Sequence, residues 1–556
     1  MTNKFLSKSL DLLTRRQTNI LSAAFVIMVT VILSQVLGLI RQRLLVSIFG
    51  ASNNLGIYLY STQLPDTIFQ LTIAAALTSA FIPVFSEYLA RGKEQEAHKM
   101  ASTLLAIGVA LFAVFAIILA IFAQQILQIF NLGANFTPKE MVLMANLMRI
   151  IIIGQLLFII ATFFTALLQS YNHFFVPGIA AALYNLGIII GVLIFSPIVG
   201  IYSTAIGVIL GGLIFIGAQI PLARQVGFHF RPDMSYIKSE GVKKIGKLMW
   251  PRTISVIIFQ LGTIGIGSFI SFLNDPGRMN VIFDFAQTLA FAPVALFGQT
   301  IAQAAFPVLS REKDRLEEFK QTFIQSFNQM LYLVLPVSVL FLVLRIPLVR
   351  LVFGASKFDW PATVATGQTL ALFSISIFAQ ALITLILRAF YALHDTKVPL
   401  IIGAISTAIL IIISYLFITT FHLGVQSLGL AYSLASLFQL IILFLLLEKR
   451  VGGFGKSALL PSWTKFFISS VLTAFALYIP IKLLDQLVFD TTRTINLIIL
   501  TGISSLLGLS LYLFLTWFFD VKEAQAYILM FTKVGNWREI LKKSQELLGT
   551  GKSTQA

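Results

Sequence analysis

Two arginines near the end of the first long apolar stretch offer the clearest chemistry. Arg41 and Arg43 lie in the segment Gly38-Leu39-Ile40-Arg41-Gln42-Arg43-Leu44. A guanidinium group is planar and always charged, and it forms paired hydrogen bonds with phosphate oxygens. The pair therefore suits the anionic head group of a lipid. The alternative is two charged side chains at the edge of an apolar segment that bind no ligand.

A carboxylate next to a proline marks the second apolar stretch. Asp66 follows Pro65 in the middle of residues 55–89. Proline inside a helix removes one backbone hydrogen bond and bends the helix. A bent helix with a carboxylate fits a moving element or a cation site. Alternatively, Asp66 caps the interrupted helix or pairs with an arginine of a neighbouring helix, and the sequence leaves these interpretations open.

Two further charged residues lie inside apolar stretches. Arg149 is well inside residues 140–172, and Asp284 is near the start of residues 279–309. An ionised side chain at the centre of a bilayer costs about 3 kcal/mol even on insertion scales. We therefore expect Arg149 to have a partner or an aqueous cavity, and Asp284 is a candidate partner for a cation.

Two more arginines stand at the ends of apolar stretches. Arg252 follows Pro251 at the start of one stretch, and Arg388 ends another beside Phe390 and Tyr391. Long basic side chains reach the membrane interface from such positions. We expect both arginines to be interfacial anchors, and Pro251 is a candidate hinge.

Several classes of enzyme lack their signatures in this chain. There is no phosphate-binding P-loop, no His-Glu-x-x-His and no Gly-x-Ser-x-Gly. Cysteine is absent, which removes thiol catalysis and cysteine-based metal sites, and the five histidines are scattered. We therefore expect a protein that is not an enzyme, holds no metal or cofactor and is not driven by ATP.

The elements that position these side chains must be membrane helices. Of the 556 residues, 57% are hydrophobic and 11% are charged, and the mean hydropathy is +0.90. Soluble domains carry about 25% charged residues. Continuous apolar runs exclude the alternating pattern of a transmembrane β-barrel. The net charge of +17 fits the basic cytoplasmic loops of membrane proteins better than nucleic-acid binding.

About fourteen runs are long enough to cross a bilayer. The first is too long for a signal-peptide core and has no small-residue cleavage site, so we expect it to be retained. The predicted spans are 20–47, 55–89, 101–130, 140–172, 176–197, 201–223, 247–273, 279–309, 321–352, 362–393, 398–421, 425–448, 463–489 and 494–519.

The distribution of basic residues predicts the orientation. Lysine and arginine gather after the second, sixth, eighth, twelfth and fourteenth spans, whereas loops 197–201 and 422–424 contain none. Cytoplasmic loops carry the excess of these residues. We therefore expect both termini in the cytoplasm.

Three short matches indicate an internal repeat. Residues 81–86 (FIPVFS) align with residues 305–310 (AFPVLS), 169–177 (QSYNHFFVP) with 391–399 (YALHDTKVP), and 224–227 (RQVG) with 449–452 (KRVG). All three require nearly the same offset along the chain. Since that offset covers six spans, the copies have the same topology, and substrate sites in such transporters lie between the repeats.

The repeat defines the predicted domains. The chain is expected to be all-α, with two related six-helix bundles and two added helices. The tail from 524 to 548 is amphipathic and suits a helix in the interface or a cytoplasmic helix. The expected parts are 1–19 (cytoplasmic N-terminus), 20–230 (N-lobe), 231–455 (C-lobe), 456–520 (spans 13 and 14) and 521–556 (cytoplasmic amphipathic and disordered tail).

Several motifs resemble those of the MurJ/MviN lipid II flippases. The first span carries Ser34-Gln35-Val36-Leu37-Gly38-Leu39-Ile40-Arg41, and the second carries Leu64-Pro65 and residues 80–88 (AFIPVFSEY). The eighth has Leu296-Phe297-Gly298, and residues 388–400 (RAFYALHDTKVPL) are the most specific stretch. The resemblance runs from about residue 20 to 520.

The resemblance implies fourteen spans in the multidrug/oligosaccharidyl-lipid/polysaccharide exporter fold, in the bacterial cytoplasmic membrane. It also implies a cationic cavity whose arginines meet a pyrophosphate, and Arg41 retains one of them. Gln35, Gln70 and Thr288 stand where the family usually has arginine. Other departures are Gln42 and Gly56 for aspartate and Ala74 for glutamate.

The expected function is to move undecaprenyl-pyrophosphate-linked peptidoglycan precursor across the membrane by alternating access. An ion gradient of Na⁺, H⁺ or Cl⁻, or the membrane potential, would drive it. The alternatives are an exporter of another polyprenyl-linked saccharide and a non-transporting scaffold for cell-wall synthesis proteins. Candidate substrate-binding residues are Arg41, Arg43, Gln35, Gln70, Arg149, Asp284 and Thr288, and candidate gate or hinge residues are Pro65, Asp66 and Pro251.

Overall fold

The computed structural model describes residues 20–74, 80–454, 456–487 and 494–525. Within these ranges the regular structure is helical, and no strand occurs. The expected N-terminal segment 1–19 lies outside the described residues, as does nearly all of the expected tail helix 524–548. The side chains of Pro251 and Arg252 also lie outside them, although the helix backbone there is described.

The helices follow the apolar runs closely. Those of the first repeat are α2 (Ile20–Phe49), α3 (Asn53–Phe69), η1 (Gln70–Ala74), α4 (Ile82–Ala90), α5 (Glu94–Ile121), α6 (Ala123–Ile129), α7 (Pro138–Ser170), α8 (Phe175–Val199), α9 (Tyr202–Gln225) and η3 (Met234–Lys238). The later ones are α10 (Glu240–Ser271), α11 (Pro276–Pro293), η4 (Val294–Gln299), α12 (Thr300–Arg311), α13 (Leu316–Val343), α14 (Arg345–Phe353), α15 (Trp360–Ser374), α16 (Ile377–Ala392), α17 (Lys397–Tyr415), η5 (Leu416–Thr420), α18 (Gln426–Val451), α19 (Lys456–Leu487) and α20 (Thr494–Phe518).

Twelve helices among the described residues are long and apolar enough to cross a membrane. A thirteenth candidate is the pair α15 and α16, which is bent by 45°. The remaining predicted span, 55–89, contains α3, η1 and α4 on either side of residues that the structure does not describe. The expectation of an all-helical, multi-pass membrane protein is therefore confirmed.

Backbone conformation supports the internal repeat independently of the sequence matches. Residues with positive φ occur at corresponding ends of helices in the two copies. The pairs are Gly50 and Asp275, Asn172 and His394, Gly200 and His422, and Gly227 and Gly452, and each pair is separated by nearly the offset of the sequence matches. Only glycine and a few polar residues adopt this conformation at low cost, so its recurrence marks equivalent turns.

The second and eighth predicted spans share a further feature. Each contains a short π-helix, η1 beginning at Gln70 and η4 beginning at Val294. The separation of the two starting positions matches the offset of the repeat. Since π-helices are rare and gather at functional sites, their equivalent positions add to the case for duplication.

The chain divides into two compact units that alternate along the sequence. Unit 1 contains residues 1–289, 348–373 and 397–439, and unit 2 contains residues 290–347, 374–396 and 440–556. The division into lobes at residues 230 and 455 stays a prediction.

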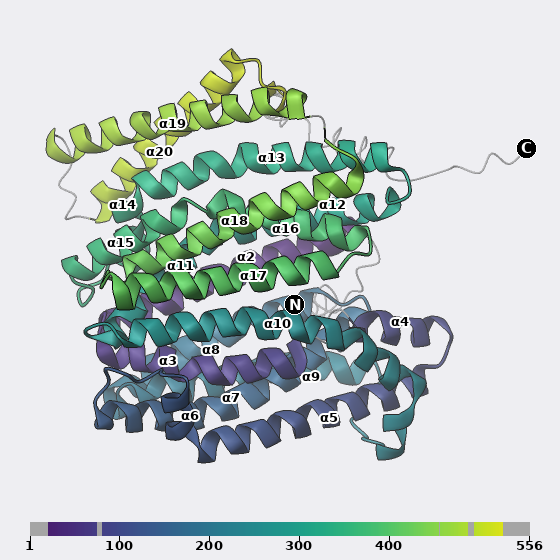
Figure 1. Cartoon of the computed structure of the whole chain (residues 1–556). Coiled ribbons are helices and arrows are strands. Elements are labelled where there is room, and N and C mark those ends of the chain that lie inside the picture. The colour runs from purple at the N-terminus through teal and green to yellow at the C-terminus, as the bar shows by residue number, and fades with distance from the viewer. Residues whose placement is uncertain (1–19, 75–79, 455, 488–493, 526–556) are drawn as a thin grey trace, which may run out of the picture. The chain divides into compact units, whose positions relative to one another are not determined.

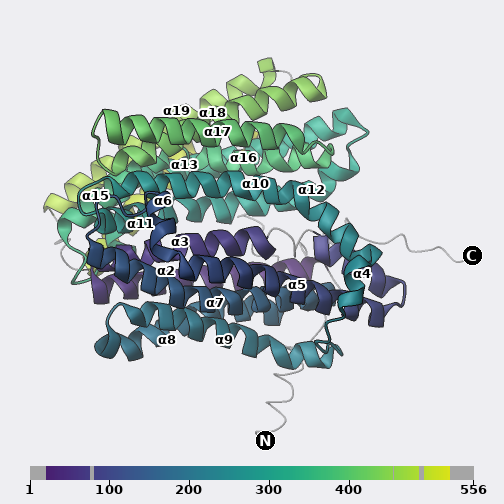
Figure 2. The ribbon, with the colours of Figure 1, turned by 60° about the horizontal axis from the view of Figure 1, so that its bottom comes forward.

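Glycines bring two helices of unit 1 into close contact. Helices α8 and α9 lie side by side (Figures 1 and 2). Gly187 and Gly191 of α8 face Gly211 and Gly207 of α9, and a Cβ atom at either α8 position would collide with the backbone of α9. Small residues four apart allow such approach between membrane helices, where dispersion replaces the hydrophobic effect.

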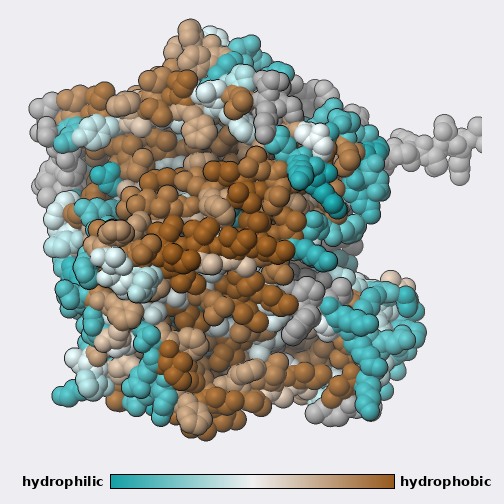
Figure 3. Space-filling view, viewed as in Figure 1, coloured by the Kyte–Doolittle hydropathy of each residue, from teal (hydrophilic) through white to brown (hydrophobic). Residues whose placement is uncertain are grey.

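Apolar side chains cover the outside of unit 1 along α10 and α17, which pack against each other. Figure 3 shows this brown surface across the middle of the face in view. Exposed apolar residues of these two helices include Phe259 and Leu261 on α10 and Ile401 and Ile412 on α17. A surface of this kind is suited to contact with lipid chains.

Unit 2 holds the last two helices through polar contacts, one buried and one partly buried. Tyr512 of α20 donates a hydrogen bond to the carbonyl of Tyr332 on α13 at 3.0 Å. On α19, Trp463 donates from Nε1 to Asn328 Oδ1 of α13 at 2.9 Å. Buried polar groups in a bundle must be paired, so these contacts fix α19 and α20 against α13.

Candidate functional site

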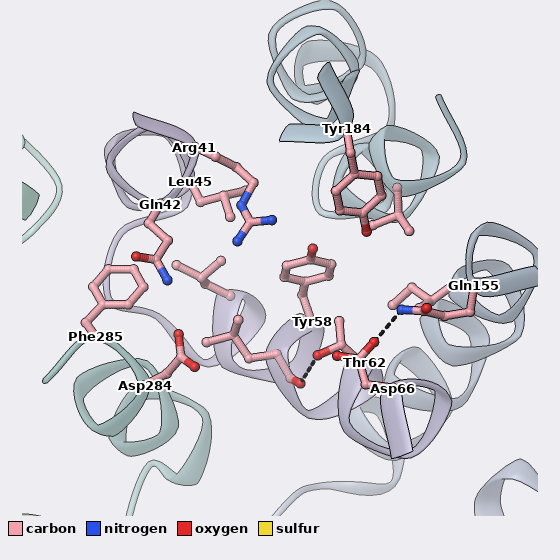
Figure 4. Close-up of a pocket in the computed structure, with 14 residues that line it drawn as sticks. Arg41, Gln42, Leu45, Tyr58, Thr62, Asp66, Gln155, Tyr184, Asp284 and Phe285 are labelled. Atoms are coloured by element: carbon pink, nitrogen blue, oxygen red, sulfur yellow. Dashed lines mark hydrogen bonds between the residues drawn. The ribbon is translucent and has the colours of Figure 1, made fainter. Parts of the chain in front are cut away.

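A cavity of about 210 Å³ lies inside unit 1. It opens among helices α2, α3, α7, α8, α9 and α11 (Figure 4). Its walls combine charged, amide, phenol and apolar groups. The lining residues are Arg41, Gln42, Leu45, Leu55, Tyr58, Leu59, Thr62, Asp66, Ile151, Gln155, Tyr184, Val208, Asp284 and Phe285.

Helix α3 supplies one polar row to the cavity. Tyr58, Thr62 and Asp66 are four residues apart, so they share one face of the helix. Helix α3 continues through Pro65 and becomes the π-helix η1 at Gln70. The proline and the π-helix together place an interrupted hydrogen-bond ladder directly beside the carboxylate.

Asp66 has a specific partner on α7. The amide Nε2 of Gln155 donates a hydrogen bond to Asp66 Oδ1, drawn as a dashed line in Figure 4. Only 6% of Gln155 is exposed, and its Oε1 atom has no hydrogen-bond partner. An unsatisfied amide oxygen in a buried place is costly, so the Oε1 atom of Gln155 is an acceptor that no described residue uses.

Helix α11 forms the opposite wall. Asp284 points into the cavity from this side (Figure 4). One turn further along, Thr288 Oγ1 accepts a hydrogen bond from Gln42 Nε2 of α2 at 3.1 Å. Helices α2 and α11 are therefore joined at the edge of the cavity by an amide and a hydroxyl.

Arg41 reaches the cavity from α2 without a full set of partners. Its Nε atom is buried and has no hydrogen-bond partner. The guanidinium group points toward the phenol groups of Tyr58 and Tyr184 (Figure 4). A guanidinium whose Nε donor is buried and unused is prepared to bind an acceptor that the protein does not itself supply.

The lining residues comprise one guanidinium and two carboxylates, a formal charge of −1 when all are ionised. The excess of arginine that the sequence resemblance implies is therefore not found in this cavity.

A contact network closes the end of unit 1 where α2 reaches Phe49. Asn53 Oδ1 accepts hydrogen bonds from the backbone of Gly277 and Arg278 at the start of α11. Arg278 pairs with Asp359 at 2.7 Å, and Lys357 donates to the carbonyl of Ile48 at 2.6 Å. These contacts join α2 and α3 to α11 and to the segment before α15.

The residues 45–498 match the family model of the lipid II flippase MurJ. This match covers most of the chain. The chain belongs to the lipid II flippase MurJ family.

Sequence relatives agree with this assignment. The probable lipid II flippase MurJ of Buchnera aphidicola from Schizaphis graminum is 24% identical over 454 residues, covering 81% of this chain and 82% of that protein. The lipid II flippase MurJ of Burkholderia cenocepacia is 25% identical over 461 residues, covering 80% of this chain and 86% of that protein.

Solved structures show the same fold. A lipid II flippase MurJ in an inward closed conformation matches with a TM-score of 0.72 at 20% identity, covering 88% of this chain and 98% of that one. An inward-facing MATE family transporter of the MOP superfamily matches with a TM-score of 0.64 at 14% identity, covering 78% of this chain and 99% of that one.

Of the site residues predicted from the sequence, the cavity brings together Arg41, Asp66 and Asp284, and Thr288 joins its edge through Gln42. Gln35 is exposed on α2, and Gln70 is half-buried in η1. Neither of these two lines the cavity, although the MurJ resemblance pointed to both.

Two predicted arginines have another task. Arg43 donates to the carbonyls of Leu351 and Gly354, where α14 ends, at 2.7 and 3.1 Å. Arg149 donates to the carbonyl of Ala120, in the last turn of α5, at 2.9 Å. The last carbonyls of a helix lack partners and attract cations, so both arginines cap helix ends and lie outside the cavity.

Arg388 contacts an aromatic ring rather than the cavity. Its guanidinium lies 5.5 Å from the ring centre of Phe306 within unit 2. This contact is a cation–π interaction, and it is compatible with the anchoring role expected for Arg388.

The cavity residues that did not appear among the predicted sites include Tyr58, Tyr184 and Gln155. The four-residue spacing of Tyr58, Thr62 and Asp66 was a usable signal for the first. Gln155 is an uncharged polar residue in an apolar run, so a search limited to ionisable residues passes over it. Tyr184 comes from a different helix, and only the packing of α8 reveals it.

Proposed function

We propose that the chain is a flippase that moves lipid II, the undecaprenyl-pyrophosphate-linked peptidoglycan precursor, between the leaflets of the bacterial cytoplasmic membrane. Membership of the MurJ family supports this function. The observation that points to Arg41 as a substrate-binding residue is its buried Nε atom, which has no hydrogen-bond partner, beside the cavity. Arg41 would donate to the pyrophosphate oxygens.

Transport would proceed by alternating access, with both termini in the cytoplasm. The basic loops after the sixth and twelfth spans would place the ends of those spans in the cytoplasm. The first span, α2, would then begin in the cytoplasm, and its Phe49 end would face outward. The Asn53, Arg278–Asp359 and Lys357 contacts would then keep the outer side of unit 1 closed. Pro65 and η1 would form a hinge in the second span, and Pro251 remains a candidate hinge in α10.

The test is complementation of a bacterial strain depleted of its own lipid II flippase. The wild-type chain should restore growth, and Arg41→Ala should abolish this rescue while membrane protein levels hold. The matched control is Arg43→Ala, which changes the same residue type two positions away but touches no cavity. Normal growth with Arg41→Ala would remove Arg41 from the mechanism.

A second candidate is an exporter of another polyprenyl-linked saccharide, because the cavity departs from the arginine-rich lining that the resemblance implies for lipid II. Rescue of a strain lacking its peptidoglycan flippase, compared with one lacking its O-antigen flippase, separates the two. Growth restored only in the O-antigen strain would reject lipid II as the substrate.

A further inference from the structure

The two carboxylates of the cavity have no task in binding an anionic head group. Asp66 and Asp284 lie in the same cavity as Arg41, the residue placed to bind the pyrophosphate. Like charges repel strongly where water is scarce. With both carboxylates ionised, the cavity opposes the entry of an anion despite Arg41.

The two carboxylates lie apart from each other, and neither forms an ion pair with Arg41 within the described residues. In Figure 4, Asp66 and Asp284 lie on opposite sides of Tyr58. Asp66 is held by Gln155, whereas Asp284 has no hydrogen bond or ion pair within the described part of the chain. Arg41 likewise makes no ion pair there. Each carboxylate is therefore free to change its charge without breaking a salt bridge.

We propose that Asp66 and Asp284 are proton-binding sites, and that their protonation converts the cavity from one that repels an anionic head group into one that accepts it. The proposal rests on the proposed function and specifies its coupling ion. Each carboxylate takes one proton from water as the anion enters and returns it when the anion leaves. The formal charge of the lining changes from −1 to +1.

The surroundings of both groups agree with protons as the ligand. The other titratable side chains of the lining are Arg41 from α2, Tyr58 from α3 and Tyr184 from α8, while α7 and α9 supply Gln155, Ile151 and Val208. A metal ion needs several converging ligands. The described residues contain no cluster of three or more acidic, histidine or cysteine side chains able to hold one, and the two carboxylates do not converge.

The hydrogen bonds of Gln155 suit either protonation state. Its amide nitrogen donates to ionised Asp66, and its unpartnered Oε1 can accept the proton of the neutral acid after the amide turns over. Gln155 is thus a positioning residue that satisfies both forms of Asp66.

The experiment measures the binding of lipid II to the full chain in nanodiscs as a function of pH. Affinity should rise by about tenfold for each unit by which the pH falls, for each carboxyl group that is protonated on binding. The double variant Asp66→Asn with Asp284→Asn should bind at every pH with the affinity that the wild type reaches in acid. Measurements in sodium chloride and in choline chloride should agree.

The matched control is Asp275→Asn. Asp275 is exposed, lies just before α11 and has a φ of 51°, a conformation that asparagine tolerates as well as aspartate. This variant should keep the pH dependence of the wild type. A pH-independent affinity of the wild type, an unchanged slope in the double variant, or binding that requires sodium would overturn the proposal.

A second measurement needs no ligand. Infrared spectra of the unliganded protein should show the C=O stretch of protonated carboxyl groups growing as pH falls, and Asp66→Asn and Asp284→Asn should each remove part of it. If lipid II binds at no pH, the proposed function fails, and the infrared titration still decides whether these two groups take up protons. Spectra without those bands at any pH would reject the proton sites themselves.

Discussion

Three arginines of similar sequence context do different work in this protein. The guanidinium groups of Arg43 and Arg149 donate hydrogen bonds to carbonyl groups at the ends of α14 and α5. Arg41 keeps a buried donor unused beside a cavity. The three arginines differ in the groups that surround them in the folded protein. The carbonyl groups at a helix C-terminus accept hydrogen bonds from a cation, so an arginine placed there needs no ligand.

A cap and a binding residue respond differently to substitution. Arg43→Gln should lower the free energy of unfolding by about 1 kcal/mol, because an exposed cation at a helix C-terminus contributes roughly that much. Thermal unfolding in detergent measures the loss, and growth rescue should persist at normal protein levels. Loss of rescue by a stably folded Arg43→Gln protein would mean that Arg43 acts in transport after all.

At the scale of elements, close packing of α8 against α9 depends on glycines, which have no side chain. A Cβ atom at Gly211 would lie 2.6 Å from the carbonyl oxygen of Tyr184, whereas one at Gly217 on the same helix would meet nothing within 4 Å. The two glycines differ in their surroundings and are otherwise comparable, so they form a natural pair for experiment.

Alanine at these two positions should have opposite effects. Gly211→Ala should destabilise the protein by about 1–3 kcal/mol through overpacking. Gly217→Ala should be neutral or stabilising by about 0.5–1 kcal/mol, because alanine favours helix. Unfolding midpoints of the two variants in the same detergent decide the matter, and equal midpoints would show that the α8–α9 contact is looser than described.

Local sequence predicted the elements well and the site only in part. Within the described residues the long apolar runs are helical, some of them as two successive helices, because the bilayer sets both length and composition. The three short matches also predicted the repeat that the positive-φ pairs support. By contrast, Gln155 and Tyr184 enter the cavity through helix packing, and Arg43 and Arg149 find their partners on other helices. Partners from distant parts of the chain leave no local signal in one sequence.

At the scale of the whole molecule, transport requires the closed end of unit 1 to open. The Arg278–Asp359 ion pair and the contact of α3 with α11 hold that end together. At Gly56 the two backbones are so close that a Cβ atom would collide with Gly277. The aspartate that the resemblance leads one to expect at position 56 would separate the helices.

Weakening this closure should expose the cavity from outside. Because the chain contains no cysteine, Thr62→Cys places a single thiol in the cavity lining. Asp359→Asn removes the ion pair but keeps the cap on Ala362, and Gly56→Ala separates the helices. Either change should speed labelling of the thiol by a membrane-impermeant reagent in whole cells. Unchanged labelling in both would contradict the role of this network as a closure.

The pH response of this closure should differ from that of the cavity. Burial raises the pKa of Asp359. The hydrogen bond from the Ala362 N–H and the Arg278 guanidinium together lower it by more than burial raises it, so the pKa of Asp359 lies below its usual value. Such a group stabilises the fold fully above its unfolded pKa and loses the effect only as pH falls through the lowered folded pKa. With Asp359 intact, the ion pair should stay formed between about pH 5 and about pH 8, so its loss should not speed the labelling of Thr62→Cys in that range.

The paired π-helices also carry information about history. A π-helix holds one residue more than the α-helical turn it replaces, and η1 and η4 stand at equivalent positions in copies of the same span. One insertion in an ancestral six-helix gene, followed by duplication and fusion, accounts for both with a single event. On that account the ancestral six-helix protein already carried the bulge before its gene was duplicated.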